Sequence, residues 1–316
     1  MASLGFLPSV GVLALVVVAY NLAWPFFPFF RKSGLDRYLR AVNGKPAWAL
    51  VTGASDGIGK GLADEIARRG FNVVLHGRND AKLEDVRRGL ALRHPGREFR
   101  IAVGDAVALG ADAGPWDAVL APLEGLNLRV LVNNVGGVPM VPILRRLDES
   151  TAEEIAGNVH LNALFPTLLT AILLPRLRNP AAPALVINVG SLADTGPPLL
   201  SFYGGCKAFL VALSTSMALE LAHTRADVEV LSMRVGATAT ERYPLQPRVF
   251  WPSAETMAES ILDRVGCGRV VVVPYWGHAL QVWLMDLVPA VLRGPLIKML
   301  MARLSLEEKK LFSKEK

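Results

Sequence analysis

Two residue types that build many small or metal-binding proteins are scarce in this sequence. It has only two cysteines, Cys206 and Cys267, too few for a disulfide scaffold or a cysteine metal cluster. Its five histidines have no spacing typical of ligands, so we expect no bound metal. The net charge is a modest +6, without a basic patch interleaved with aromatic residues, so we predict no nucleic-acid binding.

Charge is also missing from the start of the chain. Residues 4–30 contain no charged side chain, and Arg31 and Lys32 follow directly. A run of this length can span a bilayer. A cleaved signal peptide is the alternative, but a basic start and a small-residue cleavage site are both absent. Two prolines predict that the helix ends near Trp24. Because the basic residues follow the run, the rest of the chain is expected to face the cytosol.

Prolines and charged residues interrupt a second apolar stretch, residues 279–304. The interruptions argue against a membrane-spanning helix. We expect an amphipathic segment that lies on a membrane or covers a ligand site, and a helix packed on the main domain is the alternative. The mean hydropathy of +0.34 comes mainly from the two ends of the chain.

A glycine-rich turn, residues 53–59, lies between two predicted elements. Residues 49–52 end an apolar run typical of a buried parallel strand, and residues 60–69 have apolar positions at helical spacing. Residues 71–75 predict the next strand. In this context, glycines let the backbone approach a dinucleotide pyrophosphate at a helix N-terminus. The alternative is a glycine-rich turn that binds nothing.

The residues after the second predicted strand bear on the choice of cofactor. An NAD-preferring site usually places an acidic side chain there, on the ribose 2′-hydroxyl. This chain instead has His76, Gly77, Arg78 and Asn79. Arg78 can pair with a 2′-phosphate, although it could also be an ordinary solvated arginine. We therefore predict NADP(H).

Tyr203 and Lys207 are one helical turn apart on the same face of a predicted helix. A free tyrosine has a pKa of about 10, and a neighbouring ammonium lowers it by stabilising the phenolate. Ser191 follows the buried strand predicted at residues 185–189, at the sheet edge where open α/β proteins bind ligands. The Tyr-x-x-x-Lys spacing is common by chance. Together with a dinucleotide-binding turn, however, it indicates transfer of a hydride and a proton at a carbonyl or alcohol.

These motifs occur in the order of a known family. The chain resembles the classical short-chain dehydrogenases/reductases over residues 49–240. The matching residues are Thr52, Gly53, Gly57, Gly59, Asp105, Asn133, Asn134, Val135, Gly136, Asn162, Ser191, Tyr203 and Lys207. Residues 54–60, 252–255 and 274–281 resemble the branch with membrane-bound very-long-chain 3-oxoacyl-CoA reductases and 17β-hydroxysteroid dehydrogenases. That resemblance covers nearly the whole chain.

The alternation of strands and helices predicts one α/β domain with appended ends. The resemblance implies that this domain, residues 45–278, is a Rossmann-type, doubly wound parallel sheet that binds NADP. A membrane anchor at residues 1–32 precedes it, and an amphipathic segment with a basic tail follows at residues 279–316.

The resemblance also implies a role for each functional residue. Tyr203 is the general acid in reduction, and Lys207 lowers its pKa and holds the nicotinamide ribose. Ser191 orients the carbonyl, and Asn162 anchors a water of the proton relay. The residues expected to bind the cofactor are Gly53, Ser55, Asp56, Gly57, Ile58, Gly59, Arg78, Asp105, Asn134, Tyr203, Lys207, Val235 and Thr240.

Two departures from the family pattern concern the site. Ser191 is one residue closer to Tyr203 than the family spacing predicts, which implies a shortened loop. The usual Pro-Gly after the sixth strand is Val235-Gly236 here, which weakens the alignment of Thr240.

The leading interpretation is an NADPH-dependent ketone reductase, or reverse alcohol dehydrogenase, acting on a lipid-like substrate, foremost a long-chain 3-oxoacyl-CoA. A keto-steroid or specialised-metabolite ketone is an alternative substrate. A non-catalytic NADP-binding interaction protein is an alternative of another class, and retention of Asn162, Ser191, Tyr203 and Lys207 argues against it. We expect a protein of the endoplasmic reticulum membrane with its catalytic domain in the cytosol, and a homodimer is left open.

Overall fold

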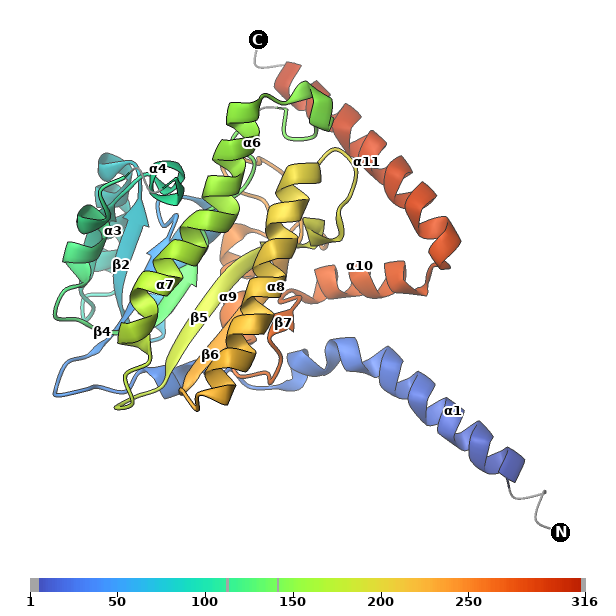
Figure 1. Cartoon of the computed structure of the whole chain (residues 1–316), viewed down its shortest axis with the longest axis horizontal. Coiled ribbons are helices and arrows are strands. Elements are labelled where there is room, and N and C mark those ends of the chain that lie inside the picture. Colours follow the sequence, from blue (N-terminus) through green and yellow to red (C-terminus); the bar gives the residue numbers. More distant parts are fainter. Residues whose placement is uncertain (1–5, 112–113, 141, 314–316) are drawn as a thin grey trace.

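A single parallel sheet of seven strands forms the centre of the protein (Figure 1). The computed structural model describes residues 6–111, 114–140 and 142–313. The strand order is β3-β2-β1-β4-β5-β6-β7. The strands are β1 (Ala47–Thr52), β2 (Asn72–Gly77), β3 (Phe99–Val103), β4 (Asn127–Asn133), β5 (Ala184–Ser191), β6 (Val228–Val235) and β7 (Val271–Val272). The order reverses direction between β1 and β4, so the predicted doubly wound sheet is confirmed.

The central strands are apolar throughout because both faces of the sheet are covered. All six residues of β1 are buried. Ala49 and Val51 belong to one hydrophobic cluster, and Trp48 and Leu50 belong to the other. Alternate side chains of a strand point to opposite faces, so a strand buried on both sides has no polar alternation.

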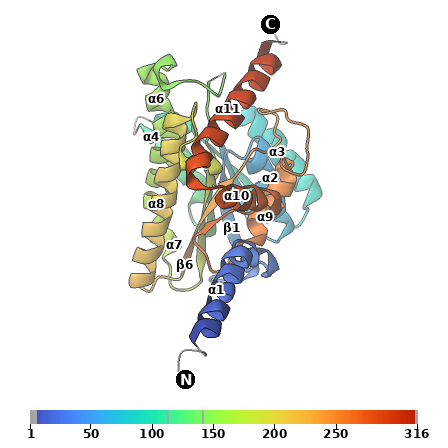
Figure 2. The ribbon, with the colours of Figure 1, turned by 90° about the vertical axis from the view of Figure 1, so that its right-hand side faces the viewer.

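Helices form a layer on each face of the sheet (Figure 2). One layer contains α2 (Gly57–Arg68), α3 (Asp80–Arg93) and α9 (Ala254–Asp263). The other contains α4 (Ala106–Gly110), α5 (Trp116–Leu120), α7 (Phe165–Leu177) and α8 (Ser201–His223). Helix α6 (Ala152–Val159) continues into α7 through one π-helical turn, η5 (His160–Leu164).

The N-terminal and C-terminal helices lie on the same side of this three-layer body and run to opposite ends of the molecule (Figures 1 and 2). Helix α1 (Phe6–Ala23) projects away and is followed by a 3-10 helix, η1 (Trp24–Phe30). The predicted end of the first helix near Trp24 is confirmed, because the 3-10 helix begins at Trp24 with Pro25 in its first turn. The second apolar stretch forms two helices, α10 (Trp276–Leu287) and α11 (Ala290–Ser313), with Pro289 between them.

Helix α11 meets the main body again near its end. Glu308 is only 2% exposed, and its two carboxylate oxygens accept hydrogen bonds from the backbone N–H groups of Ile143 (2.6 Å) and Leu144 (3.0 Å). The C-terminal helix is therefore fastened to the loop between β4 and α6.

Candidate active site

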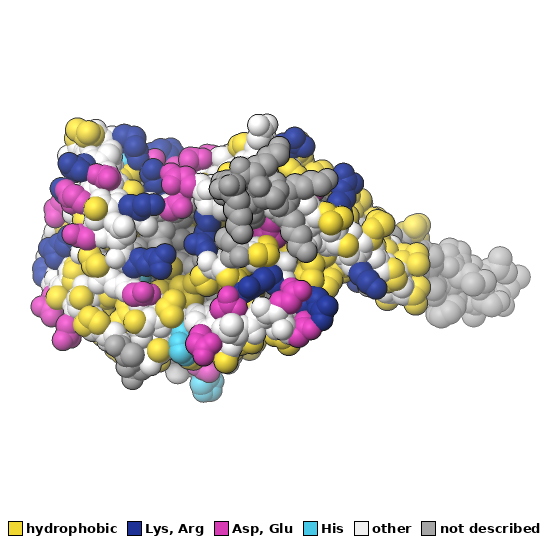
Figure 3. Space-filling model, turned by 90° about the horizontal axis from the view of Figure 1, so that it is seen from above, with side chains coloured by type: hydrophobic (Ala, Val, Ile, Leu, Met, Phe, Trp, Pro, Cys, Tyr) yellow, Lys and Arg dark blue, Asp and Glu magenta, His cyan; other side chains and the backbone are white. Residues whose placement is uncertain are grey.

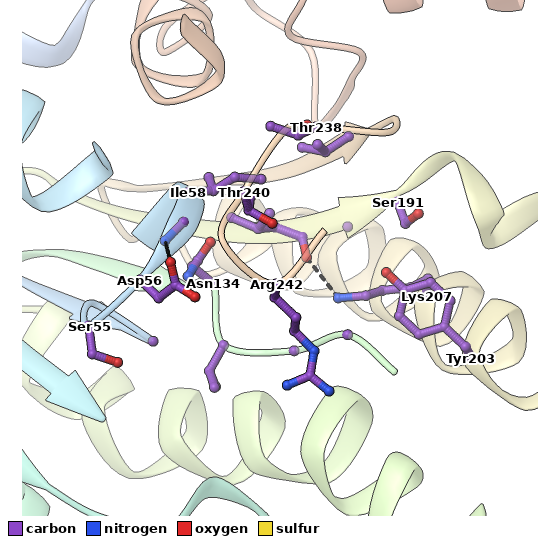
Figure 4. Close-up of a pocket in the computed structure, with 18 of the residues that line it drawn as sticks. Ser55, Asp56, Ile58, Asn134, Ser191, Tyr203, Lys207, Thr238, Thr240 and Arg242 are labelled. Atoms are coloured by element: carbon purple, nitrogen blue, oxygen red, sulfur yellow. Dashed lines mark hydrogen bonds between the residues drawn. The ribbon is translucent and has the colours of Figure 1, made fainter. Parts of the chain in front are cut away.

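A cavity of about 510 Å³ opens at the carboxyl ends of the parallel strands (Figure 4). Its lining comes mainly from the loops that follow β1, β2, β4, β5 and β6, with two side chains from α8. The lining residues are Gly53, Ser55, Asp56, Gly57, Ile58, Arg78, Asn79, Lys82, Asn134, Val135, Gly136, Gly137, Val189, Gly190, Ser191, Tyr203, Lys207, Val235, Gly236, Thr238, Thr240 and Arg242. Most of the predicted site residues therefore meet in one place.

The glycine turn after β1 has a geometry that only glycine accommodates without strain. Gly53 and Gly57 have φ angles of +68° and +52°. Gly59 lies behind the turn, where an added Cβ would be 2.1 Å from the carbonyl oxygen of Gly53. Asp56 caps α2, its side chain accepting a hydrogen bond of 2.5 Å from the N–H of Gly57. The turn brings bare backbone and a helix N-terminus to the cavity, which fits a dinucleotide pyrophosphate.

The end of the cavity beyond the turn carries positive charge. Arg78 and Lys82 line it, from the end of β2 and the first turn of α3. The side chain of Asn79 caps α3 by accepting from the N–H of Lys82 at 2.9 Å. This arrangement fits the phosphate-bearing ribose predicted for NADP.

Asp105 lies elsewhere among the described residues. It is the N-cap of α4, its carboxylate accepting from the N–H of Val107 at 2.8 Å, and it does not line the cavity. The expectation that Asp105 binds the cofactor stays a prediction.

Tyr203 and Lys207 lie beside each other on α8, with the ammonium 5.7 Å from the centre of the tyrosine ring (Figure 4). Lys207 is 3% exposed and donates a hydrogen bond of 3.0 Å to the carbonyl oxygen of Val189. Burial lowers the pKa of Lys207 to about 8.

Burial raises the pKa of Tyr203 above its ordinary value. The hydroxyl of Ser191 opposes that shift without cancelling it. Desolvation of the partly buried phenol is the largest cause of this shift. The lowering by Lys207 that the spacing predicts stays a prediction. At neutral pH the tyrosine is the neutral acid, the form needed to give a proton to a carbonyl.

Asn162 supports the site from behind the cavity wall. Its amide oxygen accepts from the N–H of Gly137 at 2.8 Å, and its amide nitrogen donates to the carbonyl oxygen of Gly137 at 2.9 Å. It sits in the π-helical turn η5, a form that often marks functional positions. A Cβ added to Gly136 would be 2.8 Å from the Asn162 amide oxygen and 3.1 Å from the Lys207 nitrogen. The Asn162 amide and the Lys207 ammonium thus both lie close to Gly136.

The loop after β6 covers the glycine turn. Thr240 lies over Gly57, whose added Cβ would be 3.1 Å from the threonine methyl carbon. Val235 and Thr240 both line the cavity, although Val235-Gly236 replaces the Pro-Gly that is usual in the family after this strand.

Two residues that organise this loop could not be predicted from the sequence. His278 accepts from the N–H of Gly236 at 3.1 Å through Nδ1, and its Nε2 lies 3.2 Å from the carbonyl oxygen of Ala237. Arg242 lines the cavity and donates to the carbonyl oxygens of Val138 (3.0 Å) and Pro139 (2.7 Å), so it joins the loop after β6 to the loop after β4. Both contacts join segments far apart in the chain, and no local pattern reveals them.

The fold and the site together define an oxidoreductase that uses a nicotinamide dinucleotide. A glycine turn faces a tyrosine, a lysine and a serine across one cavity at the switch point of a doubly wound sheet. The profile of the short chain dehydrogenase family matches residues 47–245. The chain belongs to this family, and it is an NAD(P)-dependent enzyme acting on the C=O/CH–OH pair.

Similar proteins are known from animals and fungi. The chain is 33% identical over 302 residues to the very-long-chain 3-oxooacyl-coA reductase let-767 of Caenorhabditis elegans, covering 94% of this chain and 93% of that one. It is 30% identical over 244 residues to the very-long-chain 3-oxoacyl-CoA reductase of Pyricularia oryzae, covering 76% and 72%. Among solved structures, a short-chain dehydrogenase from Sphingobium yanoikuyae in complex with NADPH superposes with a TM-score of 0.60 at 25% identity, covering 77% of this chain and 97% of that one.

Proposed function

We propose that this protein reduces the ketone of a long-chain 3-oxoacyl-CoA to the alcohol with NADPH. The site carries the chemistry: an acid, a lysine, a carbonyl-orienting hydroxyl and a dinucleotide turn share one cavity. The substrate class is supported by resemblance over 94% of the chain to a very-long-chain 3-oxooacyl-coA reductase.

Each of these residues has a separate role in the reduction. When bound, NADPH supplies the hydride that the ketone carbon accepts. Tyr203 gives its proton to the ketone oxygen, and the proton is present at neutral pH because the ordinary phenol pKa of about 10 lies well above it. Ser191 donates a hydrogen bond to the same oxygen and fixes its direction. Lys207 holds the ribose, and Asn162 connects it to solvent through a water.

The preference for NADPH rests on Arg78 and Lys82, which give the ribose end of the cavity two positive charges. Family membership alone does not decide the cofactor. A solved relative from Brucella melitensis is complexed with NADH, whereas the Sphingobium yanoikuyae enzyme is complexed with NADPH.

We further propose that α1 anchors the protein in the endoplasmic reticulum membrane with the catalytic domain in the cytosol. Its described side chains from Val12 to Leu22 are exposed and mostly apolar, as in a helix that faces lipid. Two other stretches, Ala152–Leu177 and Ser201–His223, are long and apolar enough to cross a membrane, but their inner faces pack on the sheet. The domain limits at residues 32, 45 and 278 and a homodimer stay predictions.

The decisive measurement is NADPH oxidation by the full-length protein in detergent. The panel contains a long-chain 3-oxoacyl-CoA, a short-chain one, a keto-steroid and a small ketone. We expect the highest kcat/KM for the long-chain thioester, with the 3-hydroxyacyl-CoA identified by mass spectrometry. Faster turnover of the steroid would favour the alternative substrate. NADPH binding without turnover of any ketone would favour a non-catalytic interaction protein.

A further inference from the structure

The segment 274–281 lies within the described residues and contributes no side chain to the cavity lining. It leads into α10, and His278 lies in the first turn of that helix. His278 is fully buried, and a buried imidazole needs partners for both of its ring nitrogens. The partners of His278 are backbone groups of the loop between β6 and α9.

The contacts of His278 fix the tautomer of its ring. Nδ1 lies 3.1 Å from the backbone nitrogen of Gly236, and Nε2 lies 3.2 Å from the carbonyl oxygens of Ala237 and Phe250. A backbone N–H can only donate and a carbonyl oxygen can only accept, so the proton is on Nε2 and Nδ1 is the acceptor. Burial lowers the pKa of His278, with the two carbonyl contacts opposing that shift, so the ring is neutral at neutral pH. The neutral imidazole therefore satisfies all three backbone groups.

Two glycines allow α10 to pack closely on this loop. A Cβ added to Gly236 would be 2.8 Å from Nε2 of His278, so the ring lies directly against the backbone of Gly236. A Cβ added to Gly277 would be 2.6 Å from the carbonyl oxygen of Val249. Any larger residue at either position would force the start of α10 away from the loop.

His278 joins the two arms of the loop at its base. Ala237 lies at the start of the loop, and Phe250 lies near its end. The backbone N–H of Ala239 donates to the carbonyl oxygen of Pro252 at 2.9 Å, which is a second tie between the same arms. The position of the loop between these arms therefore depends in part on a side chain of α10.

This loop forms one wall of the cavity. Together with the last residue of β6, it supplies the lining residues Val235, Gly236, Thr238, Thr240 and Arg242. Figure 4 shows Thr240 between Asp56 of the glycine turn and Lys207. Figure 3 shows the end of the molecule at which the strands finish, with Lys and Arg side chains around a hollow. One group that His278 holds, the N–H of Gly236, thus belongs to the cavity wall itself.

We propose that His278 is a positioning residue for the dinucleotide cofactor. By accepting from the N–H of Gly236 and donating to two carbonyl oxygens, it holds the cavity wall in the place where the cofactor binds. A wall that is already ordered loses less conformational entropy when the cofactor binds. The inference rests on the proposed function, which makes NADPH the cofactor. It makes the first turn of α10 a support of the cofactor site.

Three variants separate this role from general stability. His278→Leu removes all the hydrogen bonds of the ring and keeps an apolar side chain of similar size. His278→Asn places an amide oxygen near the position of Nδ1, where it can again accept from the N–H of Gly236. Asn127→Leu is the control, because Asn127 is also buried (7% exposed) and donates to the carbonyl oxygens of Arg40 and Lys45, both at 3.1 Å. Asn127 begins β4, at the end of the sheet away from the cavity.

The variants are compared as full-length proteins in detergent. Fluorescence titration gives the Kd for NADPH, and hydrogen–deuterium exchange of residues 236–253 without cofactor reports the order of the loop. We expect His278→Leu to raise the Kd about tenfold, as loss of these hydrogen bonds implies, and to speed exchange in the loop. The KM for NADPH should change more than kcat at saturating NADPH. His278→Asn should return the Kd to within about threefold of the unsubstituted value. Asn127→Leu should lower the urea midpoint and leave the Kd unchanged.

An unchanged Kd and unchanged loop exchange in His278→Leu would overturn the inference. So would a His278→Asn protein that binds no more tightly than His278→Leu, or an Asn127→Leu protein that loses as much affinity. If His278→Leu does not fold, His278→Gln takes its place. Its amide can donate to the carbonyl oxygens but leaves the N–H of Gly236 unpaired, so it should bind NADPH more weakly than His278→Asn. Tighter binding of NADH than of NADPH by the unsubstituted protein would contradict the proposed cofactor, and the same ratios measured with NADH would then decide the role of His278.

Discussion

Arg234 donates two hydrogen bonds to the two carboxylate oxygens of Asp194, at 2.5 and 2.6 Å. Asp194 lies three residues after Ser191, in the 3-10 helix η6 (Leu192–Thr195), and its side chain is only 6% exposed. Arg234 pairs with Gly190 in the β5–β6 register. The ion pair therefore ties the shortened loop between Ser191 and Tyr203 to the sheet.

We expect Arg234→Ala to cost about 3 kcal/mol of folding free energy, because it leaves a buried carboxylate without its partner. The loss should be smaller when Asp194→Asn is added, since the unpaired charge is then gone. The measurement is a double-mutant cycle from urea unfolding in detergent. Additive effects of the two substitutions would show that the pair does not stabilise the loop.

Tyr203→Phe keeps the ring and removes the acid. Turnover should fall by at least about a hundredfold, with NADPH binding largely kept. Tyr275→Phe is the control for loss of a phenol hydroxyl, because Tyr275 is buried (8% exposed) and does not line the cavity. Steady-state kinetics and cofactor titration of both variants check this. Near-normal turnover in Tyr203→Phe would remove Tyr203 from the role of proton donor.

Arg78→Asp should abolish or reverse the preference for NADPH over NADH, because a carboxylate repels the 2′-phosphate and can accept from a ribose hydroxyl. Arg88→Asp on α3 makes the same charge change at an exposed side chain outside the cavity lining, and it should leave the preference unchanged. The ratio of kcat/KM for the two cofactors is the readout. Equal use of both cofactors by the unmodified protein would contradict the role given to Arg78.

The sequence predicts the parts of the site whose signal is local. The apolar run of β1, the glycines after it and the Tyr203–Lys207 spacing each lie within a few residues, and hydrophobic periodicity places them on a strand, a turn and a helix. The parts it does not predict depend on tertiary contacts. Arg242 and the Arg234–Asp194 pair join separate loops. Desolvation likewise depends on the folded surroundings, so the rise that burial causes in the pKa of Tyr203 could not be read from the spacing of Tyr203 and Lys207.

His76 provides a pH-dependent component of stability away from the reacting groups. It is fully buried in β2, where its ring stacks on Phe165 with centres 5.2 Å apart. Among the described residues, neither ring nitrogen has a hydrogen-bond partner. Burial lowers its pKa to about 4, and the charge of Asp105 offsets only part of that shift.

The sign of the effect follows from proton binding. Between pH 6.5 and about 4, the unfolded chain carries a proton on this histidine and the folded protein does not. Acidification through that window therefore favours unfolding, and this contribution to stability is complete above the ordinary histidine pKa. From pH 7 to pH 5 the loss of folding free energy from His76 alone is about 2 kcal/mol.

His76→Phe keeps an aromatic ring on Phe165 and removes the titration, so the free energy of unfolding of this variant should fall by about 2 kcal/mol less over the same pH change. His223→Phe, at an exposed position on α8, is the control and should leave the pH dependence as it is. Urea unfolding at both pH values measures the difference. If His76→Phe and the unmodified protein lose the same stability on acidification, His76 is not held neutral by the fold.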